Sequence, residues 1–156
     1  MSDPSGPIVR KAFLLEALLN LFSLPLITHT STVLSYILKH PSQINPSSIL
    51  FARLFGGIII GGLTTALLYG ARHIPSRRAV YWTLGMGEVL LIPLLALEGS
   101  KVNGALSRKV AWGSIGMLAP PLVWRVFVLY VRPDWIGRER VGKDERQPLI
   151  RDEPGR

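Results

Sequence analysis

Four ionisable side chains lie inside long apolar stretches and are the residues best placed to do chemistry. They are Glu16, Arg53, Glu88 and Arg125. A charge within hydrocarbon costs about 3 kcal/mol or more unless it is paired or reaches the interface. Two acids and two bases in such positions predict either ion pairs between helices, or a polar site for a proton, an ion or a small polar substrate.

The position of each group along its apolar stretch limits which pairs can form. A helix rises about 1.5 Å per residue, which places Glu16 and Arg125 both at a depth of about 9 Å from the same membrane face. Glu88 lies at about 15 Å, level with Asn20, and Arg53 at about 6 Å from the opposite face. We therefore expect Glu16 to pair with Arg125. Glu88 can pair with Arg53 only if the arginine stem reaches inward, and a Glu16–Arg53 pair is excluded.

These charges have two interpretations. In the first, the ion pairs hold a helix bundle together, and the protein has a structural or accessory role in the membrane. In the second, Glu88, Asn20 and Arg53 form the polar site of a small transporter or channel component. A guanidinium beside Glu88 would favour the ionised carboxylate, which argues against a proton carrier.

The apolar stretches are long enough to cross a membrane. The 156 residues are 48% hydrophobic and 18% charged, with a mean hydropathy of +0.32, whereas a soluble domain carries about 25% charged residues. The stretches are continuously apolar rather than alternating, so helices are expected and not strands. Since about 20 apolar residues span a bilayer, we predict an all-α polytopic membrane protein. Its four-helix transmembrane bundle occupies residues 12–131, with spans at about 12–28, 49–71, 78–98 and 110–131.

The end of the first span is left open by the sequence. A polar run at 28–32 follows the apolar stretch. The span can stop there, in which case Val33, Leu34, Ile37 and Leu38 form one face of a helix lying in the interface. Alternatively, the helix continues with a kink as far as Leu38.

The basic residues orient the four spans. The formal net charge is +8, and most of the surplus lies at the ends of apolar stretches, which is a topology pattern and not a nucleic-acid-binding one. The side shared by both termini has 12 basic residues and the other side has four. By the positive-inside rule, segments 1–11 and 132–156 are cytosolic. The 12 are Arg10, Lys11, Arg72, Arg77, Arg78, Arg132, Arg138, Arg140, Lys143, Arg146, Arg151 and Arg156; the four are Lys39, Lys101, Arg108 and Lys109.

The second span carries small residues at intervals of four. Gly57 and Gly61 form one such series, and Gly62, Ala66 and Gly70 form another. Small side chains at this spacing allow two helices to approach closely in lipid. We expect this glycine seam to pack against another helix of the same chain, with homo-oligomerisation as the alternative.

The polar C-terminal tail, which we expect to be disordered, contains a motif that resembles a sorting signal. Residues 144–150 read Asp-Glu-Arg-Gln-Pro-Leu-Ile. This is similar to the acidic dileucine signal of vacuolar and lysosomal membrane proteins, which clathrin-adaptor complexes bind. Glu145, Leu149 and Ile150 fill its acidic and apolar positions. The resemblance implies a vacuolar or late-endosomal membrane, with the endoplasmic reticulum as the alternative location.

Enzyme chemistry gains little support from the sequence. The chain has no cysteine, and His29, His40 and His73 have no second ligand at metal-binding spacing. A Gly-x-Ser-x-Gly nucleophile elbow is also missing from the sequence. We therefore predict no cofactor and no metal. A membrane enzyme acting on a lipophilic metabolite is the third functional alternative.

The whole chain resembles the small four-span membrane proteins of filamentous fungi, which carry no assigned activity. The resemblance rests on the first span with its glutamate, on the segment Ala52–Gly57 and on the stretch Arg77–Leu91. It implies a membrane bundle and no particular mechanism. The architecture alone is also similar to that of small membrane proteins of the anthrone-oxygenase type, although no motif specific to those enzymes is present.

Overall fold

The computed structural model describes residues 6–137 and is helical throughout that range, apart from turns and loops. Within these residues, four helical segments are long and apolar enough to cross a membrane: Pro7–Thr28, Pro46–Arg72, Ile74–Ser100 and Arg108–Val131. This confirms the prediction of an all-α, multi-pass membrane protein. Each segment extends a few residues beyond the span predicted for it. The sorting motif with Glu145, Leu149 and Ile150 lies outside the described residues.

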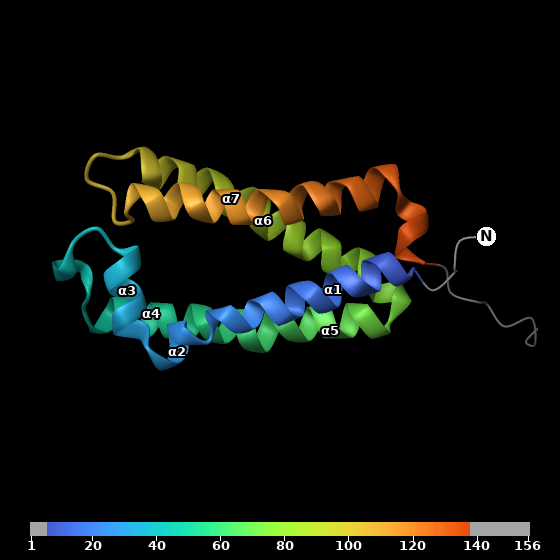
Figure 1. Cartoon of the computed structure of the whole chain (residues 1–156), viewed down its shortest axis with the longest axis horizontal. Helices are drawn as coiled ribbons and strands as arrows, with labels where there is room; N and C mark the ends of the chain where they lie inside the picture. Colours follow the sequence, from blue (N-terminus) through green and yellow to red (C-terminus); the bar gives the residue numbers. More distant parts are fainter. Residues whose placement is uncertain (1–5, 138–156) are drawn as a thin grey trace, which may run out of the picture.

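The first segment ends at a break in the helix. It consists of α1 (Pro7–Asn20), the short turn η1 (Leu21–Ser23) and α2 (Pro25–Thr28). At His29 the backbone leaves helical geometry, with φ −126° and ψ 43°, and α3 (Thr30–Ile37) starts in a new direction (Figure 1). The structure therefore agrees with the shorter of the two alternatives for the first span. The predicted apolar face of α3 is also its most buried one, with Leu34 only 6% exposed.

The second segment is one continuous rod of three elements. These are α4 (Pro46–Gly57), the π-helical turn η3 (Ile58–Leu63) and α5 (Thr64–Arg72). Asn45 and Ser48 cap the start of α4 reciprocally. The Asn45 side chain accepts from the Ser48 backbone N–H at 3.0 Å, and Ser48 Oγ accepts from the Asn45 N–H at 2.9 Å. This capping box satisfies amide groups that a helix start leaves unpaired.

The third and fourth segments are also long and helical. They contain α6 (Arg77–Ser100) and α7 (Arg108–Val126), and α7 continues into the π-helical turn η5 (Phe127–Val131). Pro93 lies inside α6, and Pro120 and Pro121 lie inside α7. Three short turns complete the described chain: η2 (Pro41–Gln43), η4 (Ile74–Ser76) and η6 (Pro133–Ile136).

The four segments are arranged as two hairpins. In the first hairpin α1 packs along α5, and in the second α6 packs along α7 (Figure 1). The hairpins meet at the end that carries α1's start and η6, and their ribbons diverge toward α3 (Figure 1). The buried apolar core lies at the meeting end. It consists of Val9, Phe13, Ala17, Leu67, Ala71, Tyr81, Val128, Leu129 and Ile136.

Candidate functional site

Arg125 joins the two hairpins by binding two carboxylates at once. From α7, its Nη1 donates to Glu88 Oε1 on α6 and its Nη2 donates to Glu16 Oε2 on α1. Arg125 is 4% exposed and Glu88 is 7% exposed, and 17% of the Glu16 side chain remains exposed. We call Glu16, Glu88 and Arg125 the carboxylate–arginine triad. It connects α1 of the first hairpin to both helices of the second.

Helical spacing explains why Glu88 faces this site. Arg77, Tyr81 and Glu88 are separated by four and seven residues, which places them on one face of α6, and all three are buried. The hydroxyl of Tyr81 accepts a hydrogen bond of 3.0 Å from Trp124 Nε1. Because Trp124 precedes Arg125 in α7, this bond fixes α7 against α6 beside the triad.

The structure contains one of the expected ion pairs and rearranges the other. The Glu16–Arg125 pair is present. The Glu88–Arg53 pair is wrong, because Glu88 binds Arg125 instead. Arg53 is exposed and donates its Nε to Thr30 Oγ1 at 3.2 Å. The depth of a residue along its helix gives no information about its lateral position. Arg53 lies in α4, near the end of the molecule at which the first hairpin diverges from the second (Figure 1).

Asn20 likewise lies in a different network from Glu88. Its Nδ2 donates to Thr64 Oγ1 at 3.3 Å, and Thr64 Oγ1 donates to the Ile59 carbonyl at 2.9 Å. This chain of bonds joins α1 to the start of α5, and it adds a second hydrogen bond to the Ile59 carbonyl, which already accepts from the Thr64 backbone N–H. The predicted polar site of Glu88, Asn20 and Arg53 is therefore not brought together.

The predicted glycine seam packs within the chain at one position only among its glycines. At Gly70, a Cβ would lie 3.3 Å from the ring of Phe13, so the glycine admits α1 closely. At Gly57, Gly61 and Gly62, a Cβ would meet no atom of a neighbouring segment within 4 Å. The intramolecular version of the prediction is wrong for these three. The spacing of small residues shows where another helix could approach closely, but it does not show that one does. Ala66, which belongs to the same series as Gly62 and Gly70, is half-buried.

Sequence reasoning treated Arg77 as a topology charge and missed its structural role. Its side chain is 2% exposed and binds backbone carbonyls from three separate parts of the chain. Nε donates to Gly70 at 2.9 Å and Nη2 to Ala71 at 3.2 Å, while Nη1 donates to Ile136 at 2.8 Å and to Gly6 at 3.3 Å. Arg77 thus ties the end of α5 to the start of α1 and to η6.

Gly6 is required where it meets this arginine. Its φ of +59° is in the left-handed region, which favours glycine. A Cβ at this position would lie 2.5 Å from the Trp135 carbonyl oxygen and 2.8 Å from Arg77 Nη1. Both the backbone geometry and the lack of space therefore exclude a side chain.

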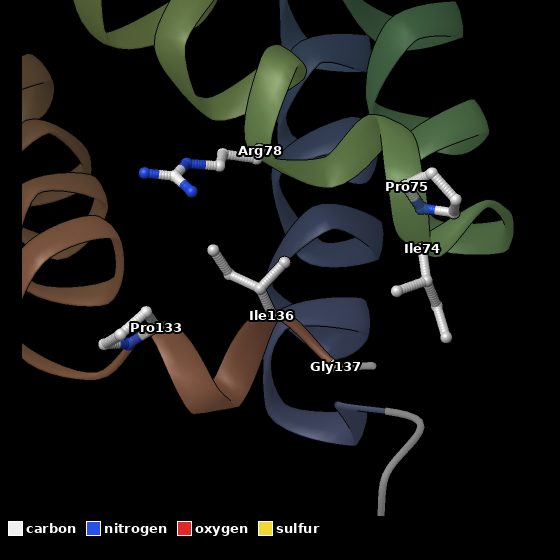
Figure 2. Close-up of a pocket in the computed structure, with 6 residues that line it drawn as sticks. All are labelled: Ile74, Pro75, Arg78, Pro133, Ile136 and Gly137. Atoms are coloured by element: carbon white, nitrogen blue, oxygen red, sulfur yellow. The ribbon is translucent and has the colours of Figure 1, made fainter. Parts of the chain in front are cut away.

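A shallow surface pocket of about 290 Å³ lies beside this end of the molecule. Figure 2 shows its lining, which comes from η4, the start of α6 and η6. One cationic side chain, that of Arg78, is set among apolar and proline residues. The lining residues are Ile74, Pro75, Arg78, Pro133, Ile136 and Gly137.

The histidines do not converge on a metal site. His29 contacts Thr28 Oγ1 at 2.9 Å, and His73 stacks on Tyr69 with ring centroids 5.1 Å apart. Within residues 6–137, no group of three or more His, Asp or Glu side chains is placed to hold a metal ion.

Comparison of the chain with models of known protein families, with curated proteins and with solved structures finds no match.

Proposed function

We propose that this protein has a structural or accessory role in a membrane, as an integral four-span element. The observation that carries the proposal is the binding of Arg125 to two carboxylates from different helices. Both Nη groups of the arginine are occupied by partners within the chain. Glu88, which the sequence also placed in a possible polar site for a substrate, thus connects two helices of the chain.

The energetics of buried charge support this role. Breaking a buried ion pair by removing one partner costs about 3–5 kcal/mol, so the triad fixes which helices pack together. Arg77 does the same at the end of the bundle with backbone carbonyls as partners. Gly57, Gly61 and Gly62 face away from the rest of the chain, and this position is compatible with contact to a helix outside it, including that of a second copy.

A transport assay distinguishes this role from the alternative of a small transporter. We expect vesicles that contain the purified chain to lose an imposed pH gradient no faster than protein-free vesicles, with valinomycin and potassium clamping the membrane potential. The physical reason is that carboxylates held in ion pairs with Arg125 do not carry protons from one side of the membrane to the other. A faster collapse that Glu88→Gln abolishes and Glu98→Gln does not would contradict the structural role.

We also propose that the protein resides in the vacuolar or late-endosomal membrane. The support is the match of Glu145, Leu149 and Ile150 to an acidic dileucine signal, combined with a cytosolic tail inferred from the charge asymmetry. Clathrin-adaptor complexes are the partner that this signal implies. The endoplasmic reticulum is the default location if the signal is idle.

The sorting proposal predicts a change of location without a change of abundance. In cells, Leu149→Ala/Ile150→Ala should move the protein to earlier secretory membranes or to the cell surface, because the adaptor loses its two apolar contacts. The folded amount should stay normal, since both residues lie outside every span. Arg151→Ala is the matched control and should not alter location. An unchanged distribution of the double variant, observed by fluorescence microscopy of an N-terminal fusion, would show the motif to be idle.

A further inference from the structure

The end of the bundle at which the hairpins meet carries positive charge that the chain does not balance. Among the described residues, six basic side chains lie at or near the span ends there, against one acid, Asp134. Asp134 pairs with Arg132 at 3.2 Å, and Arg77 is buried against backbone carbonyls. Such a surface attracts anions. The six basic residues are Arg10, Lys11, Arg72, Arg77, Arg78 and Arg132.

One of these charges lines the surface pocket of about 290 Å³. Figure 2 shows the guanidinium of Arg78 and the ring of Pro133 on one side of Ile136, with Ile74 and Pro75 on the other side. Arg78 is exposed and makes no ion pair or side-chain hydrogen bond within the described part of the chain. Its five N–H donors are therefore available to a ligand.

The pocket lies at the level of the lipid headgroups. Ile74 is the first residue of the third candidate span, and Pro133 and Ile136 follow directly after Val131, which ends the fourth. Trp135 lies between these two lining residues in η6, and tryptophan is enriched at membrane–water interfaces. A pocket that combines one cation with apolar side chains at this level suits a lipid headgroup and the ester region below it.

The wall that η6 contributes is fixed before any ligand binds. Arg77 Nη1 donates to the Ile136 carbonyl at 2.8 Å and to the Gly6 carbonyl at 3.3 Å. The Ile136 side chain is only 9% exposed, because it packs in the core at this end. A wall held in this way loses little conformational freedom on binding. The volume is close to the lower limit of small-molecule pockets, about 300 Å³, and fits a headgroup but not a whole lipid.

We propose that this pocket binds the phosphate group of an anionic phospholipid, with Arg78 as its ligand. A guanidinium matches two phosphate oxygens in a bidentate arrangement, and the isoleucine and proline side chains contact the apolar part below the phosphate. The surrounding positive charge favours a headgroup of net negative charge over phosphatidylcholine, whose choline group is a cation. With cytosolic termini, the pocket faces the leaflet that contains the anionic lipids. The site is independent of the structural role of the triad.

Lipid titration of the purified full chain tests the proposal. The chain in nonionic detergent is titrated with short-chain phosphatidylserine or with phosphatidylcholine of the same chain length, and bound lipid is counted by native mass spectrometry. Phosphatidylserine should bind saturably and at least about tenfold more tightly than phosphatidylcholine. Arg78→Ala should weaken phosphatidylserine binding by about tenfold or more, because a charge-assisted contact is lost. Equal affinity of the wild type for the two lipids would overturn the proposal.

Two further variants separate a pocket from a diffusely charged surface. Arg72→Ala is the matched control, since it removes the same charge from an exposed residue that does not line the pocket. Its effect should stay within about threefold, because a distant charge acts only through screened attraction. Ile74→Trp keeps every charge but fills the pocket, and it should lose phosphatidylserine binding. Equal losses for Arg72→Ala and Arg78→Ala, or full affinity in Ile74→Trp, would contradict a site in the pocket.

Soluble phosphates distinguish a lipid from a free anion as the occupant. Inorganic phosphate and glycerophosphoserine should not displace short-chain phosphatidylserine when present at the same concentration, because they lack the acyl chains whose apolar burial adds to the affinity. Displacement by inorganic phosphate at equal concentration would identify a site for a soluble anion and overturn the assignment to a lipid.

Discussion

Replacing Arg125 with alanine should cause the largest loss of stability of any substitution in the membrane-spanning part. The variant leaves Glu16 and Glu88 facing each other without a cation, in a site where Arg125 and Glu88 are almost fully buried. Removing one partner of a buried ion pair costs about 3–5 kcal/mol. The free energy of unfolding in mixed detergent micelles, followed by circular dichroism during titration with a denaturing detergent, measures the effect.

The triad predicts an asymmetry that a simple pair would not produce. Glu16→Ala leaves Arg125 and Glu88 as a balanced pair, so its cost should be clearly smaller than that of Arg125→Ala. Arg108→Ala is the matched control, since that arginine is exposed at the start of α7 and its effect should stay within about 0.5 kcal/mol. Equal losses for Glu16→Ala and Arg125→Ala would contradict the shared arrangement.

Removing all three charges together completes the test. The variant Glu16→Gln/Glu88→Gln/Arg125→Met should recover most of the stability that Arg125→Ala loses, because no buried charge is left unpaired. Replacement of buried ion pairs by groups of similar volume is often neutral or stabilising. Losses that simply add would mean that the three side chains act independently.

The fold could be predicted because the bilayer limits what a sequence can do. Hydrocarbon thickness sets the span length and backbone hydrogen bonding demands helices, so four apolar stretches became four helical segments. Depth along each helix was also readable, which is why Glu16 and Arg125 were matched. The lateral arrangement was not readable, since it depends on how the hairpins pack. This is why Arg53 was placed beside Glu88, and why Gly57 was expected to pack within the chain.

Arg77 was missed for a different reason. A basic residue at the start of a span is normally a topology determinant, and that interpretation was sufficient to explain it. The signal that could have identified it is its spacing from Tyr81 and Glu88, which places a charged residue on the buried face of α6. A charge on a buried face needs partners, and here they are carbonyls at the end of α5, before α1 and in η6.

Arg77→Ala should therefore destabilise the bundle by about 3 kcal/mol or more, since hydrogen bonds to charged groups are each worth about 1.5–3 kcal/mol and do not add fully. The variant leaves the carbonyls of Gly70, Ala71 and Ile136 without this donor at a buried position. Arg77→Lys should not restore the loss, because a single ammonium group cannot reach carbonyls that a planar guanidinium binds on several sides.

Arg78→Ala removes the same charge from the neighbouring residue, which is exposed, and is the matched control for topology. If Arg77 acts as a structural tie, Arg78→Ala should keep nearly the wild-type free energy of unfolding while Arg77→Ala does not. Equal effects of the two variants would mean that charge at this membrane face matters and the carbonyl contacts do not. Gly6→Ala gives an independent reading of the same contact, because its Cβ would meet Arg77 Nη1 at 2.8 Å and push the start of α1 away from the arginine.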